Sequence, residues 1–238
     1  MTHDTSNKSL RKFKIYNDKI NVMLNGIDEE DKIILWGAEG QGKTTLSFIM
    51  TLSILKNAEE NGEELPCIIY IDTQQTDKEK EGIAHREIRE SIMELCKEIG
   101  LKNEELIASH FKIISLDSEK NIRSLISTVT DLMNKYKIAS IIIDPIHYDL
   151  SYLLDHIEVM TIDYKKPIII VVNEVRASPF FKWGNDEIRR YRCKFKEFYC
   201  NCNKIIRVTK KFDNVTHTVH LTGTASDQKT YNKVEFEL

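Results

Sequence analysis

The chain has 238 residues, of which 41% are hydrophobic and 30% are charged, and its formal net charge is −3. This length suits one domain with a buried core, and the composition is that of a globular protein. The small net charge excludes a protein that binds polyanions over its whole surface, and no apolar run approaches the about 18 residues that a membrane span requires.

The amino-terminal segment and the cysteines indicate the cellular compartment of the protein. Residues 1–14 are polar and lack the apolar core of a signal peptide. The number of cysteines is odd and no secretory signal accompanies them, so we expect reduced thiols at Cys67, Cys96, Cys193, Cys200 and Cys202. These features predict a cytoplasmic protein without a membrane partner.

Predicted strands and helices alternate through most of the chain. We separate a polar arm and lead-in, residues 1–30, from a core domain, residues 31–238. Buried-strand patterns occur at Lys32–Trp36, Cys67–Asp72, Phe111–Ser115, Ile138–Asp144 and Pro167–Asn173. Helical patterns occur at Thr44–Lys56, Ile83–Ile99, Ile122–Met133 and Ser151–Ile162, and a loop is predicted at Asn57–Pro66.

The alternation predicts an α/β fold with a mainly parallel twisted sheet between helices. The runs at Ile138–Asp144 and Pro167–Asn173 are almost entirely β-branched, which is typical of strands covered on both faces. After residue 205 the helical period disappears. Three short strands are predicted to extend the sheet with antiparallel edges: Ile205–Val208, Thr216–Leu221 and Lys233–Leu238.

A phosphate-binding loop is the most specific motif. Residues 37–44 read Gly-Ala-Glu-Gly-Gln-Gly-Lys-Thr, which fits G-x-x-x-x-G-K-[ST], and they lie between a predicted strand and a predicted helix. Backbone N–H groups of such a loop converge on phosphate, the lysine reaches the β- and γ-phosphates, and the threonine binds Mg²⁺. The predicted nucleotide-binding residues are Gly37, Gly40, Gly42, Lys43, Thr44 and Thr45.

Asp144 is the second candidate ligand of the magnesium ion. It ends the apolar run Ile141–Ile143, and ligands in open α/β sheets bind at the carboxyl ends of the strands. A strand that merely ends in aspartate is the alternative. Because the phosphate-binding loop lies upstream, we predict that Thr44 and Asp144 hold Mg²⁺ beside ATP.

Several stretches resemble the ATPase core of the RecA and RadA recombinases, and the likeness covers roughly residues 30–238. They are Gly-Gln-Gly-Lys-Thr-Thr-Leu at 40–46, Tyr-Ile-Asp-Thr at 70–73, Asn-Glu-Val-Arg at 173–176, Trp-Gly-Asn at 183–185 and Glu-Phe-Tyr at 197–199. The resemblance implies a RecA-like P-loop NTPase fold that binds ATP and Mg²⁺. It also implies an oligomer with nucleotide at the subunit interfaces, and DNA as partner.

The chain departs from this family at catalytic positions. Gln74 stands where the family has its general-base glutamate, and Glu174 stands where the family has a γ-phosphate-sensing glutamine. Thr222 and Thr224 replace two lysines that reach a neighbouring subunit's ATP. A glutamine orients water but does not accept its proton. With Lys43, Gln74 and Glu174 as the candidate catalytic residues, we expect slow or absent hydrolysis unless Asp72 or Glu174 serves as base.

A basic tract interleaved with aromatic residues follows residue 175. Cations with aromatic neighbours suit a groove that pairs with phosphates and stacks on the bases of a single strand, and in the resembling family this region carries DNA-binding loops. The alternative is a solvated surface with its aromatics packed inward. The candidate nucleic-acid contacts are Arg176, Lys182, Trp183, Arg189, Arg190 and Arg192.

Cys193, Cys200 and Cys202 lie near His217 and His220 in sequence, but their spacing does not match a standard zinc knuckle, so buried thiols are the expectation. The favoured function is a RecA-like ATP-binding protein that acts on DNA in recombination, repair or replication. One alternative is a hexameric replicative helicase of the DnaB or plasmid RepA kind. Another is an inert nucleotide-binding regulator that partners a second ATPase.

Overall fold

The computed structural model describes residues 10–73, 78–116, 122–146, 151–163, 167–174, 202–210, 216–221 and 232–237. Its strands are β1 Lys12–Phe13, β2 Ile27–Asp28, β3 Lys32–Gly37, β4 Cys67–Asp72, β5 Phe111–Ser115, β6 Ile138–Asp144, β7 Ile168–Glu174, β8 Lys204–Lys210, β9 Thr216–Leu221 and β10 Asn232–Glu237. Its helices are α1 Asp18–Leu24, α2 Lys43–Glu60, α3 Lys78–Ile99, α4 Glu104–His110, α5 Ile122–Lys135 and α6 Ser151–Asp163.

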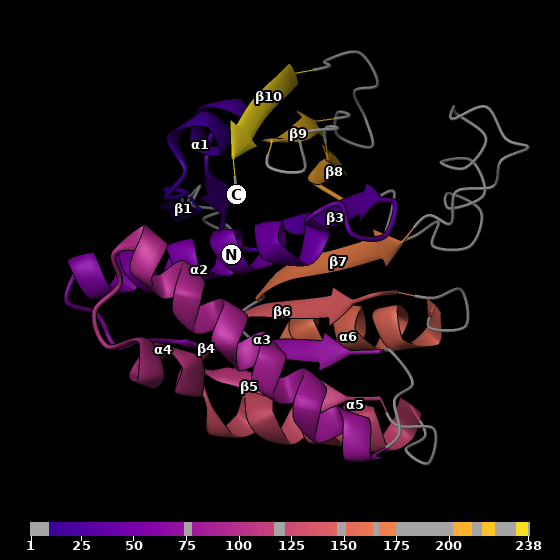
Figure 1. The fold of residues 1–238 in the computed structure, drawn as a ribbon. Helices are drawn as coiled ribbons and strands as arrows, with labels where there is room; N and C mark the ends of the chain where they lie inside the picture. The colour runs from indigo at the N-terminus through magenta and orange to yellow at the C-terminus, as the bar shows by residue number, and fades with distance from the viewer. Residues whose placement is uncertain are drawn as a thin grey trace, which may run out of the picture.

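Eight strands form one sheet in the order β10-β9-β8-β3-β7-β6-β4-β5. The six strands from β8 to β5 are parallel, and β9 and β10 are antiparallel (Figure 1). The predicted α/β fold with antiparallel strands at its carboxyl-terminal edge is therefore confirmed. One detail differs from the prediction. The strand β8 runs parallel to β3, so the antiparallel edge begins only at β9. The connection across residues 175–203 is long enough to return the chain to the amino edge of the sheet, as a parallel pairing requires.

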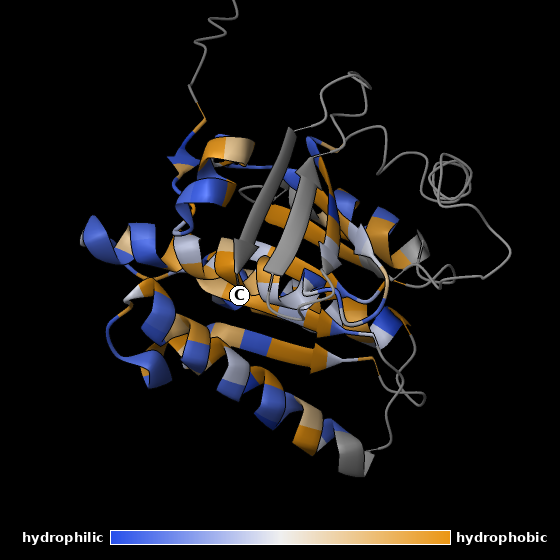
Figure 2. Ribbon diagram, turned by 45° about the horizontal axis from the view of Figure 1, so that its top comes forward, coloured by the Kyte–Doolittle hydropathy of each residue, from blue (hydrophilic) through white to orange (hydrophobic). Residues whose placement is uncertain are grey.

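Helices cover both faces of this sheet. Side chains of α1, α2, α3 and α4 form one hydrophobic cluster with one face, and α5 and α6 form a second cluster with the other. The strands are mostly hydrophobic, whereas the outer helices alternate between hydrophobic and hydrophilic residues (Figure 2). No described helix is both long and apolar enough to cross a membrane.

Helix α2 is buried on most of its circumference. Its hydroxyl residues Ser47, Thr51 and Ser53 are fully buried, and each donates a hydrogen bond to a carbonyl one turn earlier in the helix. Burial of a hydroxyl is tolerated when it is hydrogen-bonded in this way. The helix therefore runs through the core. Packing along the whole length of the helix fixes the position of its first residue, Lys43.

The lead-in packs against the same core. Asn17 caps α1 by accepting a hydrogen bond from the Ile20 amide at 3.2 Å, and the helix ends at Asn25, which has a left-handed backbone conformation. Ile15, Ile20 and Ile27 are completely buried. The sequence patterns assigned no element to this stretch because β1, α1 and β2 are too short to show a clear period.

A buried ion pair joins the residue before β3 to the start of β8. Lys204 at the start of β8 donates to Asp31, which precedes β3, and only 9% and 3% of these residues are exposed. Burial raises the pKa of Asp31, and the neighbouring Lys204 opposes that shift. The pair thus fixes two distant segments on adjacent strands.

Replacing Lys204 with alanine is expected to lower the free energy of unfolding by about 3–5 kcal/mol, because Asp31 would remain buried without its cation. Urea denaturation followed by circular dichroism measures this. The matched control is Lys12→Ala, since Lys12 pairs with Asp28 at 3.7 Å but its side chain is 47% exposed. A loss below about 1 kcal/mol is expected there. Equal losses in the two variants would contradict the importance of the buried pair.

Candidate nucleotide-binding site

The predicted phosphate-binding loop lies between the end of β3 and the start of α2. Gly42 is the N-cap of α2 and has φ of 83°, a conformation that favours glycine. Gly37 lies so close to β8 that an added Cβ would come within 2.3 Å of the Val208 carbonyl oxygen. Gly40 is exposed at the turn between them. The glycines therefore shape a tight turn at the carboxyl edge of the sheet.

The head of α2 is open to an anion. Gly42 has no side chain to cap the helix, and the first turn of α2 contains no acidic residue. The positive end of the helix dipole is therefore not neutralised by an acidic side chain of the helix's own first turn. Thr44 and Thr45 lie in this first turn.

Lys43 is held under the turn. It is 7% exposed, and its Nζ donates a hydrogen bond to the Ala38 carbonyl oxygen at 2.6 Å. Burial raises the pKa of Asp144, and the charge of Lys43 is close enough to that carboxyl group to oppose the rise. The structure thus brings the ammonium group of Lys43, the head of α2 and the end of β6 together, as the motif predicts.

Asp144 ends β6 and is 5% exposed. Its Oδ2 accepts hydrogen bonds from the Thr44 hydroxyl at 2.6 Å and from the Tyr70 hydroxyl at 3.1 Å. Burial raises the pKa of Asp144, and these two hydrogen bonds oppose the shift. The two residues predicted to hold the metal are thus in direct contact, although 100 positions separate them in sequence.

These oxygen donors fit Mg²⁺. Magnesium is usually bound through one or two carboxylates together with substrate phosphates and water, and a threonine hydroxyl beside a carboxylate is such a donor set. No group of three or more histidine, cysteine or acidic side chains that would hold a metal occurs among the described residues. Thr44 and Asp144 would thus supply two oxygen ligands of a magnesium ion, and nucleotide phosphates and water would supply the others.

Tyr70 and Asp72 complete the polar group, and the sequence patterns did not single out Tyr70 as a site residue. In the pairing of β4 with β6, Asp72 lies opposite Asp144, and Asp72 is 6% exposed. Side chains at positions 70 and 72 share one strand face, because strand side chains alternate. That period of two places Tyr70 on the face of Asp72, and the pairing of β4 with β6 is what brings it beside Asp144.

Several predicted residues are not placed by the structure. Gln74 lies outside the described residues, as do all the nucleic-acid candidates: Arg176, Lys182, Trp183, Arg189, Arg190 and Arg192. Glu174 ends β7, and its backbone is the register partner of Gly37. Its position on the sheet therefore adjoins the start of the phosphate-binding loop, and its catalytic role stays a prediction.

The structure describes only three of the five cysteines. Cys67, Cys96 and Cys202 are buried free thiols, whereas Cys193 and Cys200 lie outside the described residues. Burial raises the pKa of Cys96 to about 12 and also raises that of Cys67, so both thiols remain protonated at neutral pH. These are properties of structural rather than reactive cysteines.

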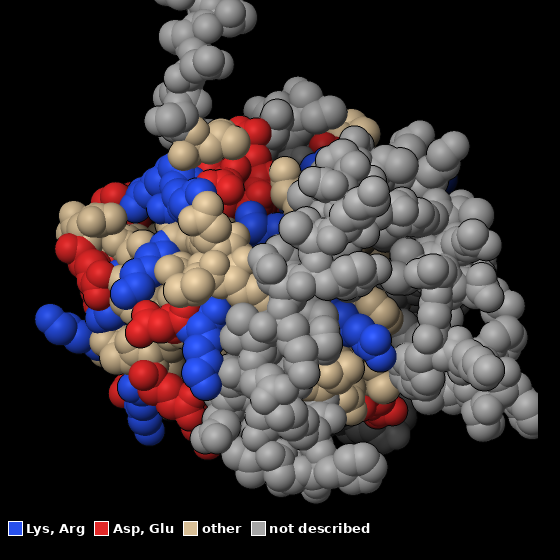
Figure 3. All heavy atoms as spheres, turned by 90° about the horizontal axis from the view of Figure 1, so that it is seen from above, with Lys and Arg blue, Asp and Glu red and all other residues tan. Residues whose placement is uncertain are grey.

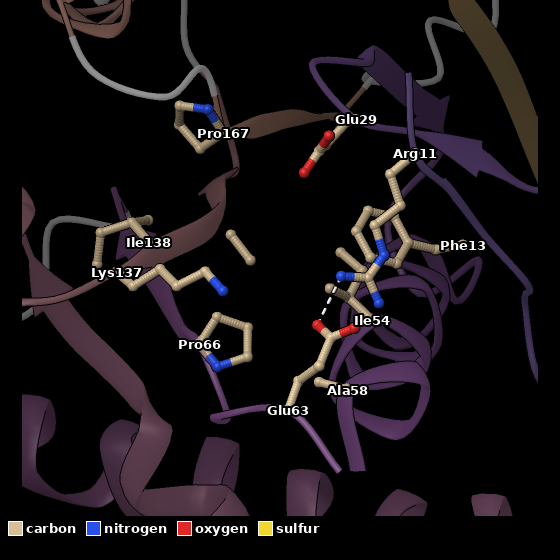
Figure 4. Close-up of a pocket in the computed structure, with 11 residues that line it drawn as sticks. Arg11, Phe13, Glu29, Ile54, Ala58, Glu63, Pro66, Lys137, Ile138 and Pro167 are labelled. Carbon is tan, nitrogen blue, oxygen red and sulfur yellow. Dashed lines mark hydrogen bonds and ion pairs between the residues drawn. The ribbon is translucent and has the colours of Figure 1, made fainter. Parts of the chain in front are cut away.

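A separate hollow of about 80 Å³ lies at the amino edge of the sheet (Figure 4). Arg11 and Glu63 form an ion pair of 2.6 Å along its wall, and the charged ends of Glu29 and Lys137 point toward it. Its remaining lining is mainly apolar: Phe13, Ile54, Ala58, Pro66, Ile138, Ala139 and Pro167. It shares no lining residue with the phosphate-binding loop at the opposite edge.

One of three comparisons with known proteins bears on the fold, the comparison with solved structures. No family model matches the sequence, and no curated protein matches it. The crystal structure of the RadB recombinase matches with a TM-score of 0.63 over 92% of this chain and 92% of that chain, at 17% sequence identity. The chain therefore has the RecA-like recombinase fold that the sequence resemblance predicted.

Proposed function

We propose that this protein binds ATP with Mg²⁺ at the head of α2 and acts on DNA as a RecA-like recombination protein with slow ATP hydrolysis. The hydrogen bond between Thr44 and Asp144 carries the proposal, because it brings the metal-binding hydroxyl and carboxylate together beneath the loop. Thr44 belongs to the motif that suggested nucleotide binding, whereas Asp144 lies 100 positions away and is brought to it by the sheet.

Each group has a defined task when the nucleotide is bound. The N–H groups of the turn and of the first residues of α2 donate to the phosphates. Lys43 leaves the Ala38 carbonyl and pairs with the β- and γ-phosphate oxygens. Thr44 and Asp144 hold the magnesium ion, which neutralises charge on those phosphates.

Hydrolysis requires a group that accepts a proton from the attacking water. Gln74 does not provide one, and general-base assistance is typically worth about 10²- to 10⁴-fold in rate. Asp72 is the nearest substitute, because it lies opposite Asp144 at the same sheet edge. We therefore propose that nucleotide occupancy, rather than fast turnover, controls assembly of the protein or its affinity for DNA.

The proposed DNA contacts lie in the tract that follows β7. On the face in Figure 3, basic and acidic side chains are mixed over the described surface. That face does not favour a polyanion and the formal net charge of the chain is −3, so we propose that DNA binding depends on the concentrated cations of the tract. The tract begins directly after Glu174, which adjoins the phosphate-binding loop through Gly37.

Single-stranded DNA binding tests this half of the proposal. We expect a labelled oligonucleotide to bind in the presence of ATP and Mg²⁺, as measured by fluorescence anisotropy. In the triple variant Arg189→Ala, Arg190→Ala and Arg192→Ala, the slope of log K against log[salt] should fall by about 2, since each phosphate contact on a single strand contributes about 0.7.

The control triple variant removes exposed cations elsewhere: Lys19→Ala, Arg86→Ala and Lys97→Ala. It should bind DNA like the wild type. Equal weakening in the two triple variants would show that net charge alone, and not the tract, determines binding. Tight ATP binding with no affinity for DNA would favour the regulator that partners another ATPase.

A further inference from the structure

Tyr70 places a hydroxyl group deep in the core beside the proposed metal site. The residue lies on β4 and is 4% exposed, and its hydroxyl donates to Asp144 Oδ2 at 3.1 Å. Burial raises its pKa far above the usual range, so the hydroxyl keeps its proton and acts as a donor. The hydroxyl is thus directed at the carboxylate that is proposed to serve Mg²⁺.

Packing alone does not require this hydroxyl. The Tyr70 ring contacts the Phe48 ring of α2 with centroids 5.4 Å apart, and a phenylalanine ring would fill the same space. Burying a hydroxyl costs free energy unless it finds a hydrogen-bond partner. Asp144 is the partner here, so the effect of the hydroxyl is exerted on that carboxylate.

Both donors use the same oxygen of Asp144. Thr44 and Tyr70 each donate to Oδ2. Because the two donors come from different elements, α2 and β4, they restrict rotation of the carboxylate.

We infer that Tyr70 is a positioning residue of the magnesium site, which orients Asp144 through its hydroxyl group. The inference rests on the proposed function, because it assigns Asp144 to magnesium. Residues that hydrogen-bond a metal ligand without touching the metal typically affect metal affinity by about 10- to 100-fold. Tyr70 therefore affects the concentration of Mg²⁺ that nucleotide binding requires.

The test is a magnesium titration of Tyr70→Phe with N-methylanthraniloyl-ADP as fluorescent probe. We expect the half-saturating Mg²⁺ concentration to rise about ten-fold. In EDTA, the affinity for the probe should stay within about two-fold of wild type, because phosphate contacts from the loop and Lys43 remain. A general structural defect would weaken binding in EDTA as well.

Tyr16→Phe is the matched control. It removes a tyrosine hydroxyl that donates to Glu60 at the far end of α2, so its magnesium titration should overlay that of the wild type. If the wild type binds the probe and the magnesium titration of Tyr70→Phe overlays that of the wild type, the role of Tyr70 is overturned while the proposed function stands. If the wild type binds the probe in neither condition, the proposed function itself fails.

Discussion

Replacing Lys43 with alanine should weaken ATP binding by about 10- to 100-fold, since a hydrogen bond to a charged group is worth about 1.5–3 kcal/mol. In the free protein the ammonium group donates to a backbone carbonyl, Ala38 O, at 2.6 Å. That bond is exchanged for stronger ones when phosphate arrives. Isothermal titration calorimetry with ATP and Mg²⁺ measures the change.

The same helix offers a matched control. Lys56 also lies in α2 and also donates to a backbone carbonyl, that of Gly100, at 2.7 Å. Lys56→Ala therefore removes the same chemical group from the same helix, away from the phosphate-binding loop. We expect its ATP affinity to equal that of the wild type. A similar loss in both variants would mean that helix stability, rather than phosphate contact, explains the effect.

Replacing Gln74 with glutamate is expected to raise ATP turnover by about 10²- to 10⁴-fold, because the substitution restores a carboxylate that accepts the proton of the attacking water. Steady-state phosphate release, with and without single-stranded DNA, measures it. The gain should vanish when Lys43→Ala is added, since the triphosphate is then poorly held.

Gln75→Glu is the control for added negative charge. It introduces the same group one position later in the sequence, away from the position at which the resembling family has its general base. We expect no gain from it. If Gln74→Glu leaves turnover unchanged, the comparison of this strand end with the recombinase core does not extend to the reacting water. Asp72→Asn would then show whether that carboxylate acts as base.

Strong local patterns predicted the strands of the core well. The bounds of β4, β5, β6 and β9 agree with the predicted ones, because short segments rich in β-branched and aromatic residues are typical of strands. Helix α4 was missed, since only seven residues separate its cap at Asn103 from β5. Helix α2 extends to Glu60, into the predicted loop, because its polar last turn has no apolar period.

The candidate site was predictable where a motif or a sheet rule applied. The spacing of the loop placed Lys43 and Thr44, and the rule that strand ends meet at one edge placed Asp144 beside them. Tyr70 could not be identified in this way, because its role depends on β4 lying next to β6 in the sheet. Periodicity shows that a strand exists but does not show its neighbours, and for the same reason the parallel direction of β8 was not predicted.

The burial of α2 has a thermodynamic consequence. This helix begins with the phosphate-binding lysine and continues through the larger hydrophobic cluster, so the ligand site cannot open without disturbing the core. A ligand that binds only the folded state stabilises it by mass action, by about 2.7 kcal/mol at one hundred times its Kd. In a cell rich in nucleotide, the abundance of this protein would accordingly depend on the fraction of its molecules that have nucleotide bound.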